Sequence, residues 1–305
     1  MLDEIDPPPP YGTEHAAGRE DGRTGAADVV ITRGATEALD LVLRVLCEPG
    51  RDAVAVSWPS FGFFERLAAL HGVTCHRVPL GGERLDRLDV DRLVSLPVKA
   101  VYLCDPNNPT STRLDTGDLE RLLDRFDGFV IIDETYAEFS GRPSHRHQVP
   151  SRPGLISVRS MSKGLAMAGL RLGALFAAPD VTEAVRLVRP PFPVPRPVAE
   201  AAAAELADPA TIAARITSCV AERDRLAKEL AECPGVLRVF ADAGFVTVRV
   251  ADQDAVMAEM ENSRIAVLPA PERWHGHLRI SVGTREDNAR LLAALRRAGA
   301  RRITP

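Results

Sequence analysis

Lysine is the scarcest charged residue in this chain, so each occurrence is informative. Only Lys99, Lys163 and Lys228 occur in 305 residues, and arginine supplies the rest of the basic side chains. The formal net charge is −4, and no basic run or basic patch with interleaved aromatic residues is present. This composition argues against a nucleic-acid-binding surface.

Long apolar runs and paired cysteines are also missing. No stretch is long and apolar enough to span a bilayer, and the first residues do not form a signal-peptide pattern. Five cysteines occur without CxxC or metal-ligand spacing, so we expect free thiols and no metal site. Free thiols are typical of a reducing compartment. Together these features predict a cytoplasmic protein that does not interact with a membrane.

Residue composition and hydrophobic pattern divide the chain into three parts. Residues 1–28 are rich in proline and glycine and predict an extended N-terminal arm. Residues 29–190 alternate short apolar runs with amphipathic helices, which predicts a large domain with a mostly parallel sheet flanked by helices on both faces. The proline-rich block Pro190–Pro197 marks a boundary, and residues 191–305 predict a smaller α+β domain. The expected fold class is therefore α/β with an α+β C-terminal domain.

Specific elements follow from these patterns. In the first half we expect strands at 29–32, 53–57, 74–79, 99–104, 129–133, 155–160 and 172–177, and helices at 36–47, 61–71, 89–96 and 115–126. In the second half we expect one long helical stretch at 198–232, strands at 236–240, 245–250, 265–268 and 278–282, and helices at 253–262 and from 285 onward.

The segment Ser160–Gly173 combines one of the rare lysines with hydroxyl groups and an arginine. An amine can lose its proton and attack a carbonyl, which a guanidinium cannot do. Ser160, Ser162 and Arg171 suit a phosphate because they offer hydroxyl donors and a bidentate fork. Lys163 beside a phosphate site points to pyridoxal 5′-phosphate (PLP). A surface lysine in a Ser/Gly loop is the simpler alternative.

Two further stretches lie where ligands bind in open α/β sheets, at the carboxyl ends of strands. Arg33–Thr36 begins a helix, whose free N–H groups favour a phosphate, although simple helix capping explains the same residues. Asn108 lies between Pro106 and Pro109, which stiffen the loop and hold the amide in place. An ordinary turn is an equally good explanation of that loop.

Asp133, Tyr136 and Arg279 complete the set of candidate site residues. Asp133 ends an apolar strand, where a carboxylate is able to pair with a protonated pyridine nitrogen, and Tyr136 is able to donate to a phenolic oxygen. An acidic cap on the following turn is the alternative for Asp133. Arg279, alone on an apolar strand, suits a substrate carboxylate or, equally well, an internal salt bridge.

Taken together, these positions resemble those of the fold type I PLP-dependent aminotransferases, and within them the histidinol-phosphate aminotransferases. The resemblance covers roughly residues 29–305. Its motifs are Arg33-Gly34-Ala35-Thr36-Glu37, Pro106-Asn107-Asn108-Pro109-Thr110, Met161-Ser162-Lys163, Ala168-Gly169-Leu170-Arg171 and Leu278-Arg279-Ile280-Ser281-Val282-Gly283-Thr284-Arg285-Glu286.

The resemblance implies a role for each matching residue. Lys163 is implied to bond the cofactor and shuttle a proton, Asp133 to pair with the pyridine nitrogen, and Arg279 to bind the substrate carboxylate. The remaining cofactor contacts are implied for Asn108 and Tyr136 at the ring hydroxyl, Phe61 on the ring face, and Gly34, Ala35, Thr36, Ser160, Ser162 and Arg171 at the phosphate. It also implies a homodimer that transfers an amino group from an amino acid or amino-alcohol phosphate to a 2-oxo acid.

The chain departs from the family pattern at several positions. Ile5-Asp6 stands where the family has Tyr-Pro, Ser111 replaces a glycine, and Leu268 replaces an arginine expected to bind the substrate phosphate. Arg273 is a candidate for supplying that missing charge.

These departures leave other functions open. A PLP-dependent decarboxylase, lyase or cyclase remains an alternative. A sensing domain of a transcription regulator is disfavoured because residues 1–28 are too short and proline-rich for a helix-turn-helix. An inactive scaffold is disfavoured because Lys163, Asp133, Asn108 and Arg279 are all present.

Overall fold

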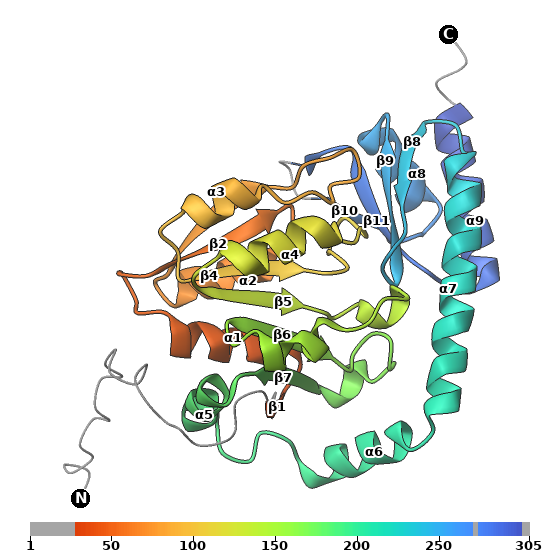
Figure 1. Cartoon of the computed structure of the whole chain (residues 1–305). Helices are drawn as coiled ribbons and strands as arrows, with labels where there is room; N and C mark the ends of the chain where they lie inside the picture. The colour runs from red at the N-terminus through yellow and green to blue at the C-terminus, as the bar shows by residue number, and fades with distance from the viewer. Residues whose placement is uncertain (1–27, 271–273, 301–305) are drawn as a thin grey trace, which may run out of the picture.

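The structure, a computed structural model, describes residues 28–270 and 274–300 and contains two β-sheets (Figure 1). The larger sheet has the strand order β1-β7-β6-β5-β4-β2-β3. Its strands are β1 (Asp28–Thr32), β2 (Ala53–Trp58), β3 (Thr74–Pro79), β4 (Ala100–Cys104), β5 (Phe129–Asp133), β6 (Leu155–Ser160) and β7 (Gly173–Ala177). The two pairs that β7 forms, with β1 and with β6, are antiparallel and the other pairs of this sheet are parallel, so the predicted mostly parallel sheet is confirmed.

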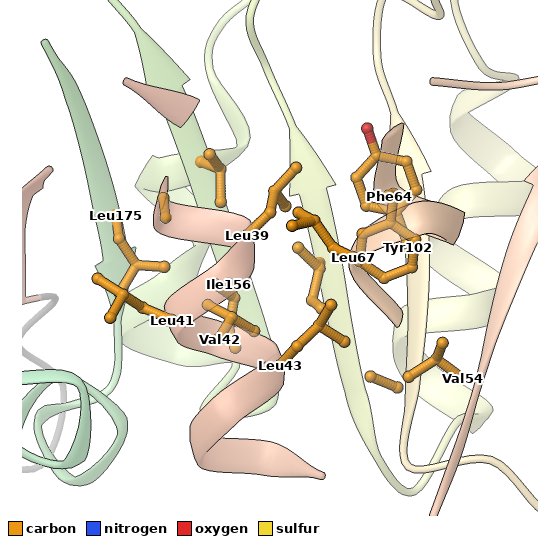
Figure 2. Packing of buried hydrophobic residues seen from close by; sticks show 14 of the residues in the cluster. Leu39, Leu41, Val42, Leu43, Val54, Phe64, Leu67, Tyr102, Ile156 and Leu175 are labelled. Atoms are coloured by element: carbon orange, nitrogen blue, oxygen red, sulfur yellow. The ribbon is translucent and has the colours of Figure 1, made fainter. Parts of the chain in front are cut away.

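Helices cover both faces of this sheet because the buried residues of its strands alternate between the faces. One face packs against α1 (Ala35–Leu46), α2 (Gly62–Leu70) and α5 (Pro179–Val188). The other face packs against α3 (Val90–Ser95) and α4 (Thr116–Arg125). Figure 2 shows the first of these cores, with leucines of α1 beside Ile156 and Phe64 beside Tyr102. The Phe64 and Tyr102 rings stack with their centroids 4.1 Å apart.

The smaller sheet is antiparallel, with the order β10-β11-β9-β8. Its strands are β8 (Val236–Phe240), β9 (Phe245–Val250), β10 (Leu268–Pro269) and β11 (His277–Ser281). Its core is formed with α7 (Pro209–Ala231), α8 (Gln253–Asn262) and α9 (Arg285–Ala300). The long helix α7 runs along the side of the molecule and connects α6 (Arg196–Leu206) to this sheet (Figure 1). Short 3-10 helices are η1 (Ala137–Phe139), η2 (His145–Ser151) and η3 (Ala168–Leu170).

Three element predictions need correction. The helical stretch 198–232 is two helices, because Pro209 cannot continue a helix and Asp208 caps α7 by accepting from the Thr211 N–H. The strand expected at 265–268 is only β10, since the chain leaves the preceding helix through the C-cap Ser263 and then Arg264, which has φ 53°, and Pro269 has no N–H for the ladder. The helix α5 was not predicted, although Pro179 occupies its first turn.

Some predictions fall outside the described residues: the arm at 1–28, apart from Asp28, the pair Ile5-Asp6, and Arg273. The division of the chain near residue 190 stays a prediction. Within the described part of the chain, no helix is long and apolar enough to cross a membrane.

Candidate active site

The carboxyl ends of β4, β5 and β6 lie side by side and open onto a cavity of about 270 Å³. Since these strands are parallel neighbours, the residues that end them converge at one edge of the sheet. The cavity collects almost the whole predicted set, which is Ala35, Thr36, Phe61, Asn108, Asp133, Tyr136, Ser160, Ser162, Lys163, Arg171 and Arg279. Gly34 lies beside it as the N-cap of α1. Cys104, Thr135 and Ala168 also line the cavity and were not predicted.

Asp133 is held in place at the buried floor of this cavity. Its Oδ1 accepts hydrogen bonds from the Thr135 backbone N–H at 3.0 Å and hydroxyl at 2.6 Å. Its Oδ2 accepts from the Tyr102 hydroxyl at 3.0 Å. Burial raises the pKa of the Asp133 carboxyl, while the bonds from Thr135 and Tyr102 act in the opposite direction. Asp133 therefore fits both interpretations made from the sequence. Its Oδ1 caps the following turn, and its carboxyl also lies buried in the cavity.

Lys163 lines the cavity from the loop between β6 and β7, in a partly exposed position. Partial burial lowers the pKa of its amine, and the positive charges of Arg279 and Arg171 lower it further. A larger fraction of this amine is therefore neutral near physiological pH than in a free lysine. A neutral amine with nearby fixed positive charges has the properties of a nucleophile and a base.

One end of the cavity is suited to an anion. Helix α1 begins at Gly34 without a side-chain cap, so the N–H groups of its first turn stay available. Arg171 donates to the Ser162 hydroxyl at 3.3 Å and to the Ala168 carbonyl at 3.0 Å. The Ser160 hydroxyl accepts from the Ser162 N–H at 3.2 Å.

Glycine is required at two positions around this anion-binding end. Gly34 has φ +84°, and a Cβ there would lie 2.8 Å from Nη2 of Arg171. At Gly173, the first residue of β7, a Cβ would lie 2.6 Å from the Gly34 carbonyl carbon and 2.8 Å from the Ala35 nitrogen. The close approach of β7 to the start of α1 thus depends on the missing side chains.

Arg279 reaches the same cavity from the smaller sheet. It donates from Nη1 to Oδ1 of Asn108 and from Nη2 to the Tyr136 hydroxyl, each at 2.9 Å. Its guanidinium lies 4.0 Å from the centroid of the Phe245 ring. Burial raises the pKa of Tyr136, and Arg279 opposes that rise. Among the described residues, the partners of Arg279 are neutral groups, and none of them forms with it the internal salt bridge that we considered.

Residue Tyr102 was missed because it lies in the middle of the uniformly apolar strand β4, where a tyrosine is indistinguishable from a core residue. The register pairs β4 with β5, which brings its hydroxyl to Asp133. Leu268 lies directly opposite Arg279 in the β10–β11 pair and is exposed.

The family model and the curated relatives that match this chain point to the same family. Residues 18–295 match the family model described as aminotransferase class I and II. Histidinol-phosphate aminotransferase of Stenotrophomonas maltophilia is 39% identical over 287 residues, covering 89% of this chain and 79% of that protein.

Solved structures give the same picture for the fold. Histidinol-phosphate aminotransferase from Clostridium acetobutylicum superposes with a TM-score of 0.82 at 23% identity, covering 90% of this chain and 84% of that one. The enzyme of that name from Sinorhizobium meliloti, solved in complex with pyridoxal 5′-phosphate, gives a TM-score of 0.80 at 22% identity, covering 90% and 77%.

Proposed function

This chain belongs to the aminotransferase class I and II family, and we propose that it uses PLP to move an amino group between an amino donor and a 2-oxo acid. One observation carries the proposal. A single cavity brings together an amine of lowered pKa, a buried carboxyl and a helix N-terminus open to an anion. These three groups match the aldehyde, the pyridine nitrogen and the phosphate of PLP.

The residues at the anion-binding end fit the phosphate group. A Cβ at Gly34 would occupy the space next to the Arg171 guanidinium. A Cβ at Gly173 would collide with the backbone at the start of α1. The uncapped N–H groups of Ala35 and Thr36 and the fork of Arg171 suit a phosphate dianion. Ser160 and Ser162 add hydroxyl donors. We therefore assign these residues, with Gly34, to the phosphate.

The other end of the cavity supplies the reactive groups. PLP, when bound, supplies an electron sink for the negative charge that forms at the substrate Cα. Asp133 would hold a proton-bearing ring nitrogen, because a cation beside the buried carboxyl favours the ionised form of that carboxyl. Phe61, Asn108 and Tyr136 line the same cavity, where Phe61 would contact the ring of the cofactor and Asn108 and Tyr136 would hold its hydroxyl group.

Lys163 and Arg279 act on the substrate. With its lowered pKa, the Lys163 amine would take the proton from the substrate Cα and give it up on the cofactor side instead of at Cα, so the same nitrogen would be base and then acid. Arg279 binds the substrate carboxylate through a bidentate fork, which positions Cα beside Lys163. The catalytic residues of the proposal are thus Lys163, Asp133 and Tyr136, with Arg279 as the substrate-binding residue.

We also propose a homodimer in the cytoplasm. The turn after α5 exposes Phe192, of which 95% is accessible, and Leu187, five residues earlier in the sequence, is exposed as well. Exposed apolar side chains that lie close together are typical of an interaction surface. The five cysteines are free thiols, which is typical of a reducing compartment. The mass of the protein in solution, measured by light scattering, tests the dimer.

The test of the proposed function is replacement of Lys163 in the PLP-loaded enzyme. The Lys163→Ala variant should lose the visible absorbance of covalently held PLP and at least a thousandfold in the rate of 2-oxo acid formation, because one residue supplies both base and acid. Lys228→Ala is the matched control, since Lys228 is exposed on α7, and it should keep wild-type turnover.

Two results would contradict this assignment. Undiminished turnover in Lys163→Ala would remove Lys163 from the chemistry. Release of CO₂ without 2-oxo acid, from wild-type protein and a panel of amino acids, would replace transamination by decarboxylation.

A further inference from the structure

A second cavity of about 340 Å³ adjoins the first, and three residues line both. These shared residues are Phe61, Asn108 and Arg279. The first cavity contains the groups that we assign to the cofactor, so the second is where the rest of a substrate extends. Its walls therefore indicate which side chain the substrate carries.

The walls of this second cavity are mainly apolar. Phe61, Leu268, Pro269 and Trp274 contribute carbon surface. Trp274 is largely buried and stacks on His277 with the ring centroids 3.9 Å apart, so its ring forms a fixed wall. The Ser60 hydroxyl already donates to Asn107 Oδ1 at 3.0 Å. Few polar groups thus remain for a polar side chain to pair with.

Arg279 is the one charged residue among the described residues that line this cavity. Its two donors to Asn108 and Tyr136 orient its guanidinium at the boundary between the two cavities. One guanidinium pairs with one carboxylate through two hydrogen bonds. Once Arg279 holds a substrate carboxylate, the described residues of this lining offer no second cation for another anion.

The side chain of Leu268 limits which substrate groups fit next to the carboxylate bound by Arg279. It is directly opposite Arg279 in the antiparallel β10–β11 pair, so the two side chains emerge from the same face of the sheet about 5 Å apart at Cβ. At this distance a cation at residue 268 would share an anionic group with Arg279. The leucine instead offers methyl groups, against which a phosphate dianion would lose hydration without gaining a partner.

We infer that the second cavity binds the large apolar side chain of an α-amino acid, aromatic or branched aliphatic, whose α-carboxylate pairs with Arg279. The inference rests on the proposed function and refines it by naming the class of amino donor. α-Amino acids whose side chain carries a phosphate fall outside this class, because Leu268 offers the phosphate no partner once Arg279 holds the carboxylate.

The first experiment measures binding of two unreactive probes to the PLP-loaded enzyme by calorimetry. 3-Phenylpropanoate and 3-phosphonopropanoate share the carboxylate and the two-carbon spacer, and they differ only in carrying an apolar ring or a phosphonate. We expect 3-phenylpropanoate to bind at least tenfold more tightly. Equal or tighter binding of 3-phosphonopropanoate would overturn the inference, whether or not any amine is turned over.

Turnover supplies the second readout. With one 2-oxo acid acceptor, kcat/KM for L-phenylalanine and L-leucine should exceed that for O-phospho-L-serine, which carries a phosphate as well as the α-carboxylate, by at least tenfold. The opposite order would overturn the inference and leave the aminotransferase function standing. If no amine were converted, the proposed function would fail, and probe binding would still decide the nature of the cavity.

A substitution tests the role of Leu268 itself. Leu268→Arg should weaken 3-phenylpropanoate binding and strengthen 3-phosphonopropanoate binding, each by about tenfold, because a second guanidinium beside Arg279 favours a second anion. The side chain is 58% exposed, so the fold tolerates the change. Leu237→Arg is the matched control, since Leu237 is a strand leucine of the same sheet, 55% exposed, outside the cavity. Unchanged probe affinities in Leu268→Arg would contradict the assignment.

Discussion

At the scale of single residues, the amine of Lys163 is the group whose environment most affects the chemistry. Its pKa lies below the ordinary value of 10.5 because of burial and the charges of Arg279 and Arg171. A lowered pKa leaves the amine neutral, and therefore reactive, at a lower pH than in free lysine. We expect trinitrobenzenesulfonate to modify Lys163 in PLP-free protein with a midpoint below pH 10.5, measured by peptide mass spectrometry.

Removing one of the nearby positive charges should reverse part of this effect. In Arg279→Gln the pKa of Lys163 rises, so the midpoint of its modification moves to higher pH. The scarcity of lysine makes this measurement clean, because Lys228 on α7 is an internal reference in each sample. If the Lys163 profile in Arg279→Gln coincided with that of the wild type, the electrostatic explanation of its lowered pKa would be wrong.

At the scale of elements, the contact between the start of β7 and the start of α1 shapes the anion-binding end. A Cβ at Gly173 meets backbone atoms of Gly34, Ala35 and Arg159, all within 2.9 Å, and backbone cannot move aside as a flexible side chain can. Gly173→Ala should therefore push α1 away from Arg171 and raise the dissociation constant of PLP about tenfold or more, which corresponds to about 1.4 kcal/mol. Titration of the PLP-free protein measures this change.

The control for this prediction is another glycine of the same loop region. Gly169 in η3 has open space where a Cβ would be, so Gly169→Ala should bind PLP as the wild type does. Thermal unfolding of both variants separates a local distortion from global loss of structure. Wild-type PLP affinity in a folded Gly173→Ala protein would refute the proposed shape of the site.

The same elements show what sequence reasoning reached and what it missed. Asp133 and Ser160 were predictable because each ends an apolar run, and parallel strands bring such ends together. The role of Tyr102 and the need for glycine at position 173 were not predictable. Both depend on contacts with residues distant in sequence, and these contacts are set by strand register and helix packing. The break before α7 was readable from Asp208-Pro209 but was obscured by the alanine-rich sequence on its N-terminal side.

At the scale of the whole molecule, the two sheets must keep their relative position because Asn108, after β4, and Arg279, on β11, are hydrogen-bonded to each other and line both cavities together. The segment after Asn108 connects them. The Ser111 hydroxyl donates to the Phe245 carbonyl at 2.6 Å and accepts from the Ala243 N–H at 3.1 Å. Thr247 donates to the Pro109 carbonyl at 2.6 Å. Ser111 therefore explains one departure from the family pattern, since its hydroxyl makes bonds that glycine cannot.

This connection has a conformational cost that makes it testable. Ser111 is fully buried with φ 56°, a left-handed conformation that costs a residue with a side chain roughly 1–2 kcal/mol and glycine almost nothing. Ser111→Ala keeps that cost and leaves the Phe245 carbonyl and Ala243 N–H without the hydroxyl, which should lower the free energy of unfolding by about 1–3 kcal/mol. Ser111→Gly loses the same hydrogen bonds but relieves the backbone, so its stability should fall between those of Ser111→Ala and the wild type. Denaturant unfolding of the three proteins gives the order, and an alanine variant as stable as the wild type would mean that the hydroxyl does not hold the two sheets together.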